Sequence, residues 1–218
     1  MSQLIFKFPF AKKYYEQDFF ISNNNFSAYK LVESWPTWPG KWLNIFGAPG
    51  SGKTHLAKIL EKKIDKIKLI DAINIKDEII QDLSDLDCLI IDSYSNNIDE
   101  KLLYSILNQS KQLENFVLIN SVNSIKNINF KLEDLKSRMN SFIYFGIELP
   151  TDDLLKVIIS KTLSDKQISL NPKISEFIIN NVERSYEKMF KFLKDVDELS
   201  LSTGKAININ LIKKVLDQ

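Results

Sequence analysis

One stretch of the chain combines glycines with a lysine and a threonine at a spacing that suits phosphate binding. It reads Gly47-Ala48-Pro49-Gly50-Ser51-Gly52-Lys53-Thr54 and matches G-x-x-x-x-G-K-[ST]. In such a loop the glycines let backbone N–H groups face phosphate oxygens, while the lysine reaches the β- and γ-phosphates. Three of the six glycines in the chain lie here. We expect the loop to bind ADP or ATP through Gly47, Pro49, Gly50, Ser51, Gly52, Lys53 and Thr54.

The surroundings of the loop agree with this expectation. It follows the apolar run 43–46 and precedes a helical pattern, KTHLAKILEKKI, that begins at Lys53. A helix that starts at this point directs the positive end of its dipole at the phosphates. His55 is the only histidine, and we expect it to pack in the first helical turn beside the nucleotide rather than to catalyse.

An aspartate supplies the acidic partner of the loop. Asp92 ends the apolar run that includes Leu89, Ile90 and Ile91, and ligands of open parallel sheets bind at such strand ends. We expect Asp92 and the hydroxyl of Thr54 to hold a hydrated Mg²⁺. Ser93 follows, at the position where vigorous NTPases usually carry a second carboxylate that orients the attacking water. We therefore expect weak hydrolysis by this chain alone.

The elements that position these residues follow from the hydrophobic pattern. Short apolar runs alternate with helical patterns and predict strands at 43–46, 66–70, 88–92, 116–120 and 142–147. This alternation is typical of a parallel sheet with helices on both faces. Beyond Pro150 only helical periodicity remains, which predicts helices at about 151–164, 172–182, 185–201 and 207–217. Residues 1–40 are expected to be irregular, because Pro, Gly and Asn interrupt them.

Composition limits the possible classes of protein. The 218 residues are 44% hydrophobic without an apolar run long enough for a membrane span, and no signal peptide is visible, so a cytoplasmic protein is expected. The formal net charge is only +1, which indicates that any contact with DNA is indirect. Cys88 lies within an apolar run and is expected to be a small buried hydrophobe. The only arginines among 29 basic residues are Arg138 and Arg184.

Together with the loop, several stretches resemble the AAA+ superfamily, and within it the replication initiator DnaA and the related Hda family. They are Asp18-Phe19-Phe20-Ile21 with Asn25 and Ala28-Tyr29, the Trp35–Gly40 turn, His55-Leu56, the strand ending at Asp92, and Leu135-Lys136-Ser137-Arg138. The resemblance covers nearly the whole chain. It implies an α/β AAA+ base domain with a five-stranded parallel sheet and helices on both faces (13–149), followed by a small all-α lid domain (150–218).

The resemblance also implies roles for individual residues. Phe20, Ile21 and Asn25 would lie around the adenine base, and the polar sensor would be Asn120 or Asn123. Arg138 would be an arginine finger, which projects into the nucleotide of a neighbouring subunit and stabilises the charge that develops during hydrolysis.

The lid departs from the initiator pattern. Initiators place a sensor arginine on the helix that begins near Arg184, whereas the aligned position here is Glu187, or Lys188 if the register shifts by one. A glutamate would repel a γ-phosphate. The departure favours a diphosphate, or a rearranged contact from Arg184, and it casts doubt on an ATP-driven switch in this protein.

The N-terminal residues 1–12 include Gln3-Leu4-Ile5-Phe6-Lys7-Phe8, which resembles peptides that dock in the pocket of the replication sliding clamp. Gln3, Leu4, Phe6 and Phe8 would make the contacts; a strand packed on the base domain is the alternative for this short motif. Since the chain ends soon after the lid helices, we do not expect it to bind an origin by itself.

These features indicate a regulator of replication initiation that binds the sliding clamp and promotes hydrolysis of ATP bound to the initiator DnaA, using Arg138 in trans. A helicase-loader-like AAA+ adaptor is the alternative, and a nucleotide-binding scaffold with a vestigial finger is a third possibility. The sequence leaves open whether the resident nucleotide is ADP or ATP, and whether the chain forms homo-oligomers.

Overall fold

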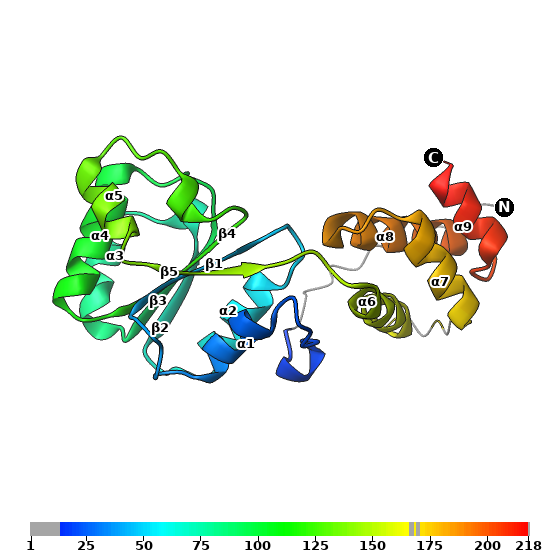
Figure 1. The fold of residues 1–218 in the computed structure, drawn as a ribbon, viewed down its shortest axis with the longest axis horizontal. Helices are drawn as coiled ribbons and strands as arrows, with labels where there is room; N and C mark the ends of the chain where they lie inside the picture. Colours follow the sequence, from blue (N-terminus) through cyan, green and yellow to red (C-terminus); the bar gives the residue numbers. More distant parts are fainter. Residues whose placement is uncertain (1–13, 166–167, 169–170, 218) are drawn as a thin grey trace. The chain divides into compact units, whose positions relative to one another are not determined.

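The computed structural model describes residues 14–165, 168 and 171–217. The chain divides into two compact units, one spanning Tyr14–Glu148 and one that contains Leu149 and the residues after it. The first unit combines a sheet with helices, whereas the second is built from helices (Figure 1). The clamp-contact residues expected from the sequence, Gln3, Leu4, Phe6 and Phe8, lie outside the described residues.

A parallel sheet of five strands, in the order β2-β3-β4-β1-β5, forms the centre of the first unit. The strands are β1 (Trp42–Gly47), β2 (Ile67–Asp71), β3 (Cys88–Tyr94), β4 (Phe116–Ser121) and β5 (Ile143–Ile147). The predicted five-stranded parallel sheet is thus confirmed. Because all strands run in one direction, their carboxyl ends share one edge, where the phosphate loop follows β1 and Asp92 lies near the end of β3.

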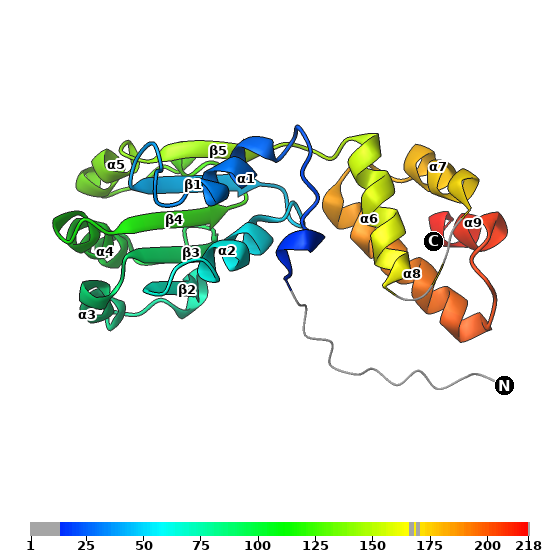
Figure 2. The same ribbon diagram turned by 90° about the horizontal axis from the view of Figure 1, so that it is seen from below.

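Helices cover both faces of this sheet, as predicted (Figure 2). They are α1 (Phe26–Glu33), α2 (Lys53–Glu61), α3 (Ile79–Asp82), α4 (Glu100–Gln112) and α5 (Glu133–Met139), with 3-10 turns η1 (Glu16–Asp18), η2 (Ala72–Asn74), η3 (Leu83–Asp85) and η4 (Ile125–Asn127). Alternate residues of β3 face different cores: Cys88 and Ile90 pack with α1 and α2, whereas Leu89 and Ile91 pack with α3, α4 and α5. Cys88 is a buried free thiol, as expected.

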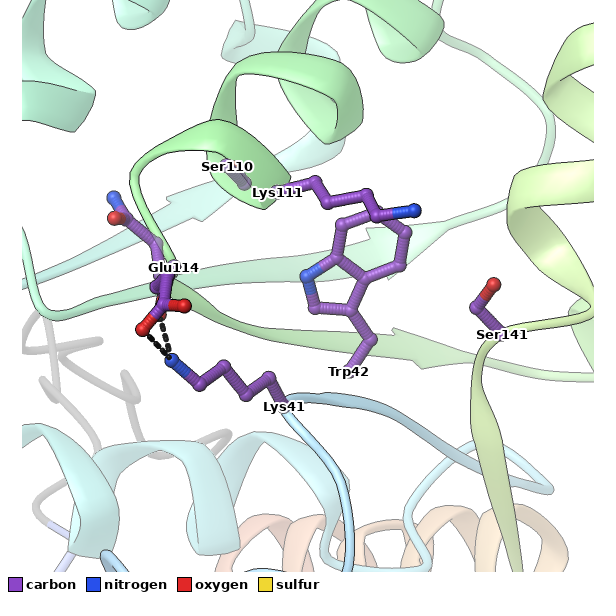
Figure 3. Close-up of a pocket in the computed structure, with 7 residues that line it drawn as sticks. Lys41, Trp42, Ser110, Lys111, Glu114 and Ser141 are labelled. Atoms are coloured by element: carbon purple, nitrogen blue, oxygen red, sulfur yellow. Dashed lines mark hydrogen bonds and ion pairs between the residues drawn. The ribbon is translucent and has the colours of Figure 1, made fainter.

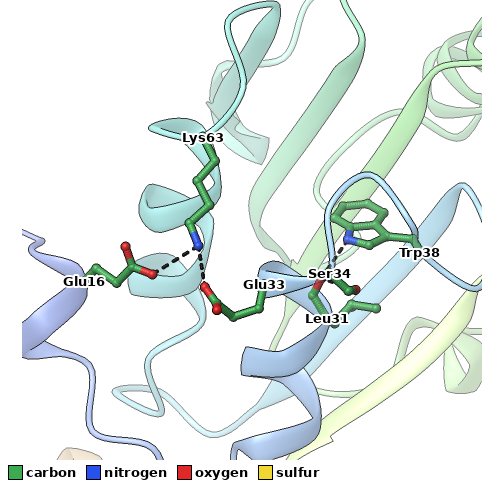
Figure 4. A network of polar contacts seen from close by, with 6 residues as sticks. All are labelled: Glu16, Leu31, Glu33, Ser34, Trp38 and Lys63. Carbon is green, nitrogen blue, oxygen red and sulfur yellow. Dashed lines mark hydrogen bonds and ion pairs between the residues drawn. The ribbon is translucent and has the colours of Figure 1, made fainter.

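The expectation that residues 1–40 are irregular is wrong, because α1 lies among them. Its residues Ala28, Leu31 and Val32 are buried at the i, i+3, i+4 spacing of a helix face. After α1, the Ser34 hydroxyl and the Trp38 indole N–H both donate to the carbonyl oxygen of Leu31, at 2.9 and 2.8 Å (Figure 4). The helix is short, and the turn residues on either side of it hid its period.

The second unit is all-helical, as predicted. Its helices are α6 (Asp152–Ser164), α7 (Pro172–Asn181), α8 (Tyr186–Thr203) and α9 (Ile209–Leu216). Before each helix a polar side chain accepts a hydrogen bond from a first-turn N–H group; these caps are Thr151, Asn171, Ser185 and Asn208. Apolar side chains from all four helices form one core. Among the described residues, no helix has both the length and the apolar character that crossing a membrane requires.

Asn44 of β1 is a buried polar residue whose side chain joins three segments. Its Nδ2 donates to the carbonyl oxygen of Ile119 at 2.8 Å and to the Ser121 hydroxyl at 2.9 Å. Its Oδ1 accepts a hydrogen bond from the backbone N–H of Ile125 at 3.2 Å. The side chain therefore fixes β1 against β4 and against the turn that follows β4.

Replacing Asn44 with leucine should lower the free energy of unfolding by about 1–3 kcal/mol, because buried groups of β4 and Ile125 lose their partner. Urea denaturation followed by circular dichroism measures the change. Asn127→Leu, at an exposed position, is the control and should have little effect. Equal midpoints for the two variants would show that the buried amide contributes nothing to stability.

Candidate functional site

The phosphate loop joins β1 to α2, and its glycines are required by geometry. Gly50 and Gly52 have φ angles of 80° and 98°, in the left-handed region that favours glycine. A Cβ on Gly47 would lie 2.8 Å from the carbonyl oxygen of Ile147, and one on Gly52 would lie 2.8 Å from Cε2 of Phe19. The loop backbone is therefore closely surrounded and adopts a conformation that other residues would strain.

Lys53 begins α2, and its ammonium group lies within the loop. Nζ donates to the carbonyl oxygens of Gly47 and Ala48, at 2.7 and 3.0 Å. Burial lowers the pKa of Lys53 below its ordinary value, and the Asp92 carboxylate opposes this effect. A partly desolvated cation is stabilised by an anion beside it, so the loop is suited to a phosphate.

The structure brings Thr54, Asp92 and Asn120 together beside the loop. The Thr54 hydroxyl donates to Oδ2 of Asp92 at 2.7 Å, and Nδ2 of Asn120 donates to Oδ1 of Asp92 at 2.9 Å. The same Nδ2 lies 3.2 Å from the carbonyl oxygen of Lys53. Asp92 is only 6% exposed, so these donors stabilise a carboxylate that has lost most of its hydration. A hydroxyl and a carboxylate are also oxygen ligands of the kind that Mg²⁺ prefers.

Of the two candidate sensor residues, Asn120 is the one at this cluster. Its side-chain Oδ1 is buried and has no hydrogen-bond partner among the described residues. A buried acceptor of this kind fits a site that receives a further polar group. Asn123 is exposed, and its carbonyl oxygen accepts a hydrogen bond from the Ser121 hydroxyl at 2.6 Å.

Ser93, next to Asp92, offers a hydroxyl where a second carboxylate would orient water. Its side chain is exposed, and its φ of 58° lies in the left-handed region. The pairing of β3 with β4 is irregular between Ile91 and Tyr94, which accounts for this local bend. The site therefore holds a group suited to binding a cation and lacks a carboxylate at the neighbouring position.

The residues expected around the base differ in what they contact. Asn25 is 4% exposed, and its side chain is used within its own segment: Nδ2 donates to the carbonyl oxygen of Phe20, and Oδ1 accepts from the N–H of Ser22, both at 2.9 Å. Phe20 and Ile21 are 44% and 41% exposed. Asn25 thus shapes the segment, and the two apolar side chains are available at its surface.

Two contacts join residues 14–19 to the phosphate loop and to α2. His55 lies in the first turn of α2, with Nε2 2.7 Å from the carbonyl oxygen of Tyr15. Phe19, which sequence reasoning missed as a contact of the loop, lies against Gly52. The signal for it was the run Phe19-Phe20-Ile21, because three successive large apolar side chains do not all face solvent in a folded domain.

Arg138 lies on α5, and its guanidinium Nη2 donates to Oδ1 of Asn108 on α4 at 2.7 Å. The α5 helix packs on the face of the sheet opposite α2, so Arg138 and the helix of its own phosphate loop cover different faces. Asn108 is a further residue that the sequence did not suggest, because only the packing of α4 against α5 reveals the contact.

In the second unit, Arg184 is paired within its own unit. Its Nη2 lies 3.1 Å from Oδ2 of Asp152, the first residue of α6. Glu187 and Lys188 are exposed in the first turn of α8. The three candidate sensor positions therefore present one paired arginine and two exposed side chains of opposite charge.

A cavity of about 320 Å³ lies apart from the phosphate loop (Figure 3). Trp42, the first residue of β1, lines the cavity, whereas the phosphate loop begins at Gly47, the last residue of β1. Its lining residues are Lys41, Trp42, Ser110, Lys111, Glu114, Asn115 and Ser141. Nζ of Lys41 is bonded to the carbonyl and carboxylate oxygens of Glu114, at 2.8 and 3.0 Å. Of the described residues, none of those singled out in the sequence lines this cavity.

Sequence comparison relates the chain to two groups of proteins. Residues 152–216 match the family model described as Hda, lid domain. The chromosomal replication initiator protein DnaA of Buchnera aphidicola subsp. Cinara cedri is 25% identical over 236 residues, covering 95% of this chain and 53% of that protein. The chain therefore spans about half the length of this curated relative.

Structural comparison agrees on the fold. Domain III of the replication initiation protein DnaA from Thermotoga maritima matches with a TM-score of 0.79 and 20% identity, over 96% of this chain and 98% of that one. AMPPCP-bound DnaA from Aquifex aeolicus matches with a TM-score of 0.68 and 18% identity, over 88% of this chain and 67% of that one. With the phosphate loop, the sheet order and the lid match in place, the chain has an AAA+ fold and is related to Hda through its lid and to DnaA over most of its length.

Proposed function

We propose that the chain binds ADP or ATP with Mg²⁺ at the phosphate loop. Lys53 would contact the phosphates, and Thr54 with Asp92 would hold the hydrated Mg²⁺, which offsets phosphate charge when bound. The 2.7 Å contact between the Thr54 hydroxyl and Asp92 supports this assignment, since it places two oxygen donors side by side. The similarity to an AMPPCP-bound DnaA also supports it. Asn120 would act as the polar sensor.

The base of the nucleotide would contact the segment before α1. Phe20 and Ile21 supply exposed apolar surface, which suits the face of a purine. Asn25 would act indirectly, because its amide already holds the turn that carries Phe20. His55, whose ring packs against the same segment, would lie beside this region.

Hydrolysis by this site alone would be weak. The exposed serine at position 93 cannot act as a carboxylate base toward water. In the lid, Arg184 is paired with Asp152, and the positions that the resemblance assigns to a sensor arginine hold Glu187 or Lys188. A site with these features would retain nucleotide and turn it over slowly.

The hydrolysis that matters would take place in a partner, with Arg138 as its arginine finger. The position of Arg138 and its hydrogen-bond partner support this proposal. It extends from α5, on the other face of the sheet from α2, and its contact is the neutral amide oxygen of Asn108 rather than a carboxylate. Among the described residues, this bond engages one of its five N–H donors, and no carboxylate is paired with its charge, which suits contact with a phosphate of another molecule.

The partner would be ATP-bound DnaA, and the result would be negative regulation of replication initiation. The N-terminal peptide, with Gln3, Leu4, Phe6 and Phe8, would tether the chain to the sliding clamp on newly replicated DNA, so its contact with DNA would be indirect. In this proposal, residues 1–12 bind the clamp, residues 13–149 form the nucleotide-binding base domain and residues 150–218 form the lid.

Nucleotide binding can be tested with two lysines of α2. Lys53→Ala should raise the Kd for ADP and ATP tenfold or more, roughly, since it removes a charged hydrogen-bond donor to phosphate. Lys58→Ala is the matched control, because Lys58 pairs with Glu61 on the same helix. Isothermal titration calorimetry with and without Mg²⁺ measures the affinities of both lysine variants. Asp92→Asn should reduce only the increase in affinity that Mg²⁺ produces. Equal Kd values for the two lysine variants would rule out this phosphate site.

Arg138→Ala should remove the stimulation of hydrolysis of DnaA-bound ATP on clamp-loaded DNA, an effect on the order of 10³ to 10⁵ for an arginine finger. Lys136→Ala, which removes an exposed cation from the same helix, should retain it. Release of labelled phosphate from DnaA measures both. If Arg138→Ala stimulates hydrolysis of DnaA-bound ATP as fully as wild type does, Arg138 is not an arginine finger. The chain would then be a nucleotide-binding scaffold.

The clamp tether predicts a separate phenotype. Gln3→Ala/Leu4→Ala should lose binding to the sliding clamp, and with it the stimulated hydrolysis, while ADP binding stays unchanged. Surface plasmon resonance on immobilised clamp gives the affinity. If the double variant still binds the clamp as wild type does, the peptide is not the tether. Capture of the replicative helicase without clamp binding would favour the helicase-loader alternative.

A further inference from the structure

The segment Tyr14–Phe19, which we call the strap, touches the phosphate loop directly. The Phe19 ring lies so close to Gly52 that a Cβ there would be 2.8 Å from Cε2. The same ring stacks on Tyr29 of α1, with centroids 5.7 Å apart, and meets the ring of His55 edge-on at 5.4 Å. The loop end of the strap is therefore held by aromatic packing on the loop, α1 and the first turn of α2.

Further contacts attach the strap to the rest of α2. Nε2 of His55 lies 2.7 Å from the carbonyl oxygen of Tyr15, and the His55 ring meets Tyr14 at 5.3 Å. At the end of α2, Nζ of Lys62 donates to the carbonyl oxygen of Tyr14 at 2.6 Å and lies 5.4 Å from the centre of the Tyr15 ring. The strap thus follows α2 from the phosphate loop to its last turn.

Lys63 adds an ion pair at the same end. Its ammonium lies 3.1 Å from Oε1 of Glu16 and also contacts Glu33 of α1 (Figure 4). The hydrogen bond from Lys63 lowers the pKa of Glu33. The Glu16 side chain is 50% exposed, and η1 contains no buried residue. The contacts at this end are individually weak in water, so the strap can open locally without unfolding the base unit.

This arrangement couples the strap to the loop because Phe19 packs on one conformation of Gly52. That residue has a φ of 98°, the turn that aims the following N–H groups at a phosphate. A ligand that fixes the loop also fixes the surface on which the ring packs. Coupling between two sites is reciprocal, so a strap that stays closed must favour the ligand to the same degree.

We propose that nucleotide binding at the phosphate loop closes the strap on α2, so that the bound nucleotide controls the order of the segment that leads to the N-terminus. The inference rests on the proposed nucleotide binding. A site that hydrolyses nucleotide weakly then has a function, because the presence of the nucleotide alone determines whether the strap is open or closed. The coupling requires a ligand with a di- or triphosphate group, because only the phosphates bind the loop and fix its conformation at Gly52.

The test uses wild type and two lysine variants with ADP and Mg²⁺ as the probe. The amides of Asp18 and Phe19 donate to the carbonyl oxygens of Tyr15 and Glu16, both at 3.0 Å, so their hydrogen exchange reports closure. ADP should slow this exchange by about fivefold or more. Lys62→Ala, which removes both contacts with Tyr14 and Tyr15, should weaken ADP binding about twofold to fivefold, whereas Lys58→Ala should not.

The outcomes separate the two proposals. If ADP binds wild type but exchange at Asp18 and Phe19 does not change, or if the two lysine variants bind ADP equally, the coupling is wrong and the nucleotide site stands. If wild type binds neither ADP nor ATP, the nucleotide site itself is wrong, and the coupling fails with it. Unfolding midpoints of the variants, expected to match wild type, exclude a general loss of structure.

Discussion

A buried carboxylate at the carboxyl edge of the sheet is the constraint on which the candidate site depends. Asp92 is 6% exposed, and it is stabilised there by the Thr54 hydroxyl and the Asn120 amide. These two bonds connect the first turn of α2 with β3 and β4. Because burying an unpaired charge is costly, the contacts that satisfy Asp92 also keep the phosphate loop and the proposed cation ligands in fixed relative positions.

The base unit carries two cations in different surroundings. Lys53 is enclosed by its own loop, where burial lowers its pKa and makes a bound anion favourable. Arg138 is held by a neutral amide on the other side of the sheet, and within the described part of the chain no carboxylate is bonded to it. These surroundings, with a serine beside Asp92, underlie our proposal that the chain holds one nucleotide and acts on another.

Sequence alone gave the strands, the lid helices and the phosphate loop, because their signals are local: alternation, period and glycine spacing. It missed α1, whose eight residues are too few for their period to stand out among turn residues. It also missed the contacts of Phe19 and Asn108, which bring together residues about thirty positions apart. Asn120 and Asn123 could be separated only once the pairing of β4 with its neighbours was known.

We propose that this chain promotes hydrolysis in the nucleotide site of its partner. The most direct measurement is a single-turnover assay in which DnaA is preloaded with γ-labelled ATP and this chain with unlabelled ADP, on clamp-loaded DNA. The account predicts rapid release of the label in the presence of the chain. Retention of the label on DnaA, with hydrolysis seen only when labelled ATP is loaded on this chain, would contradict it.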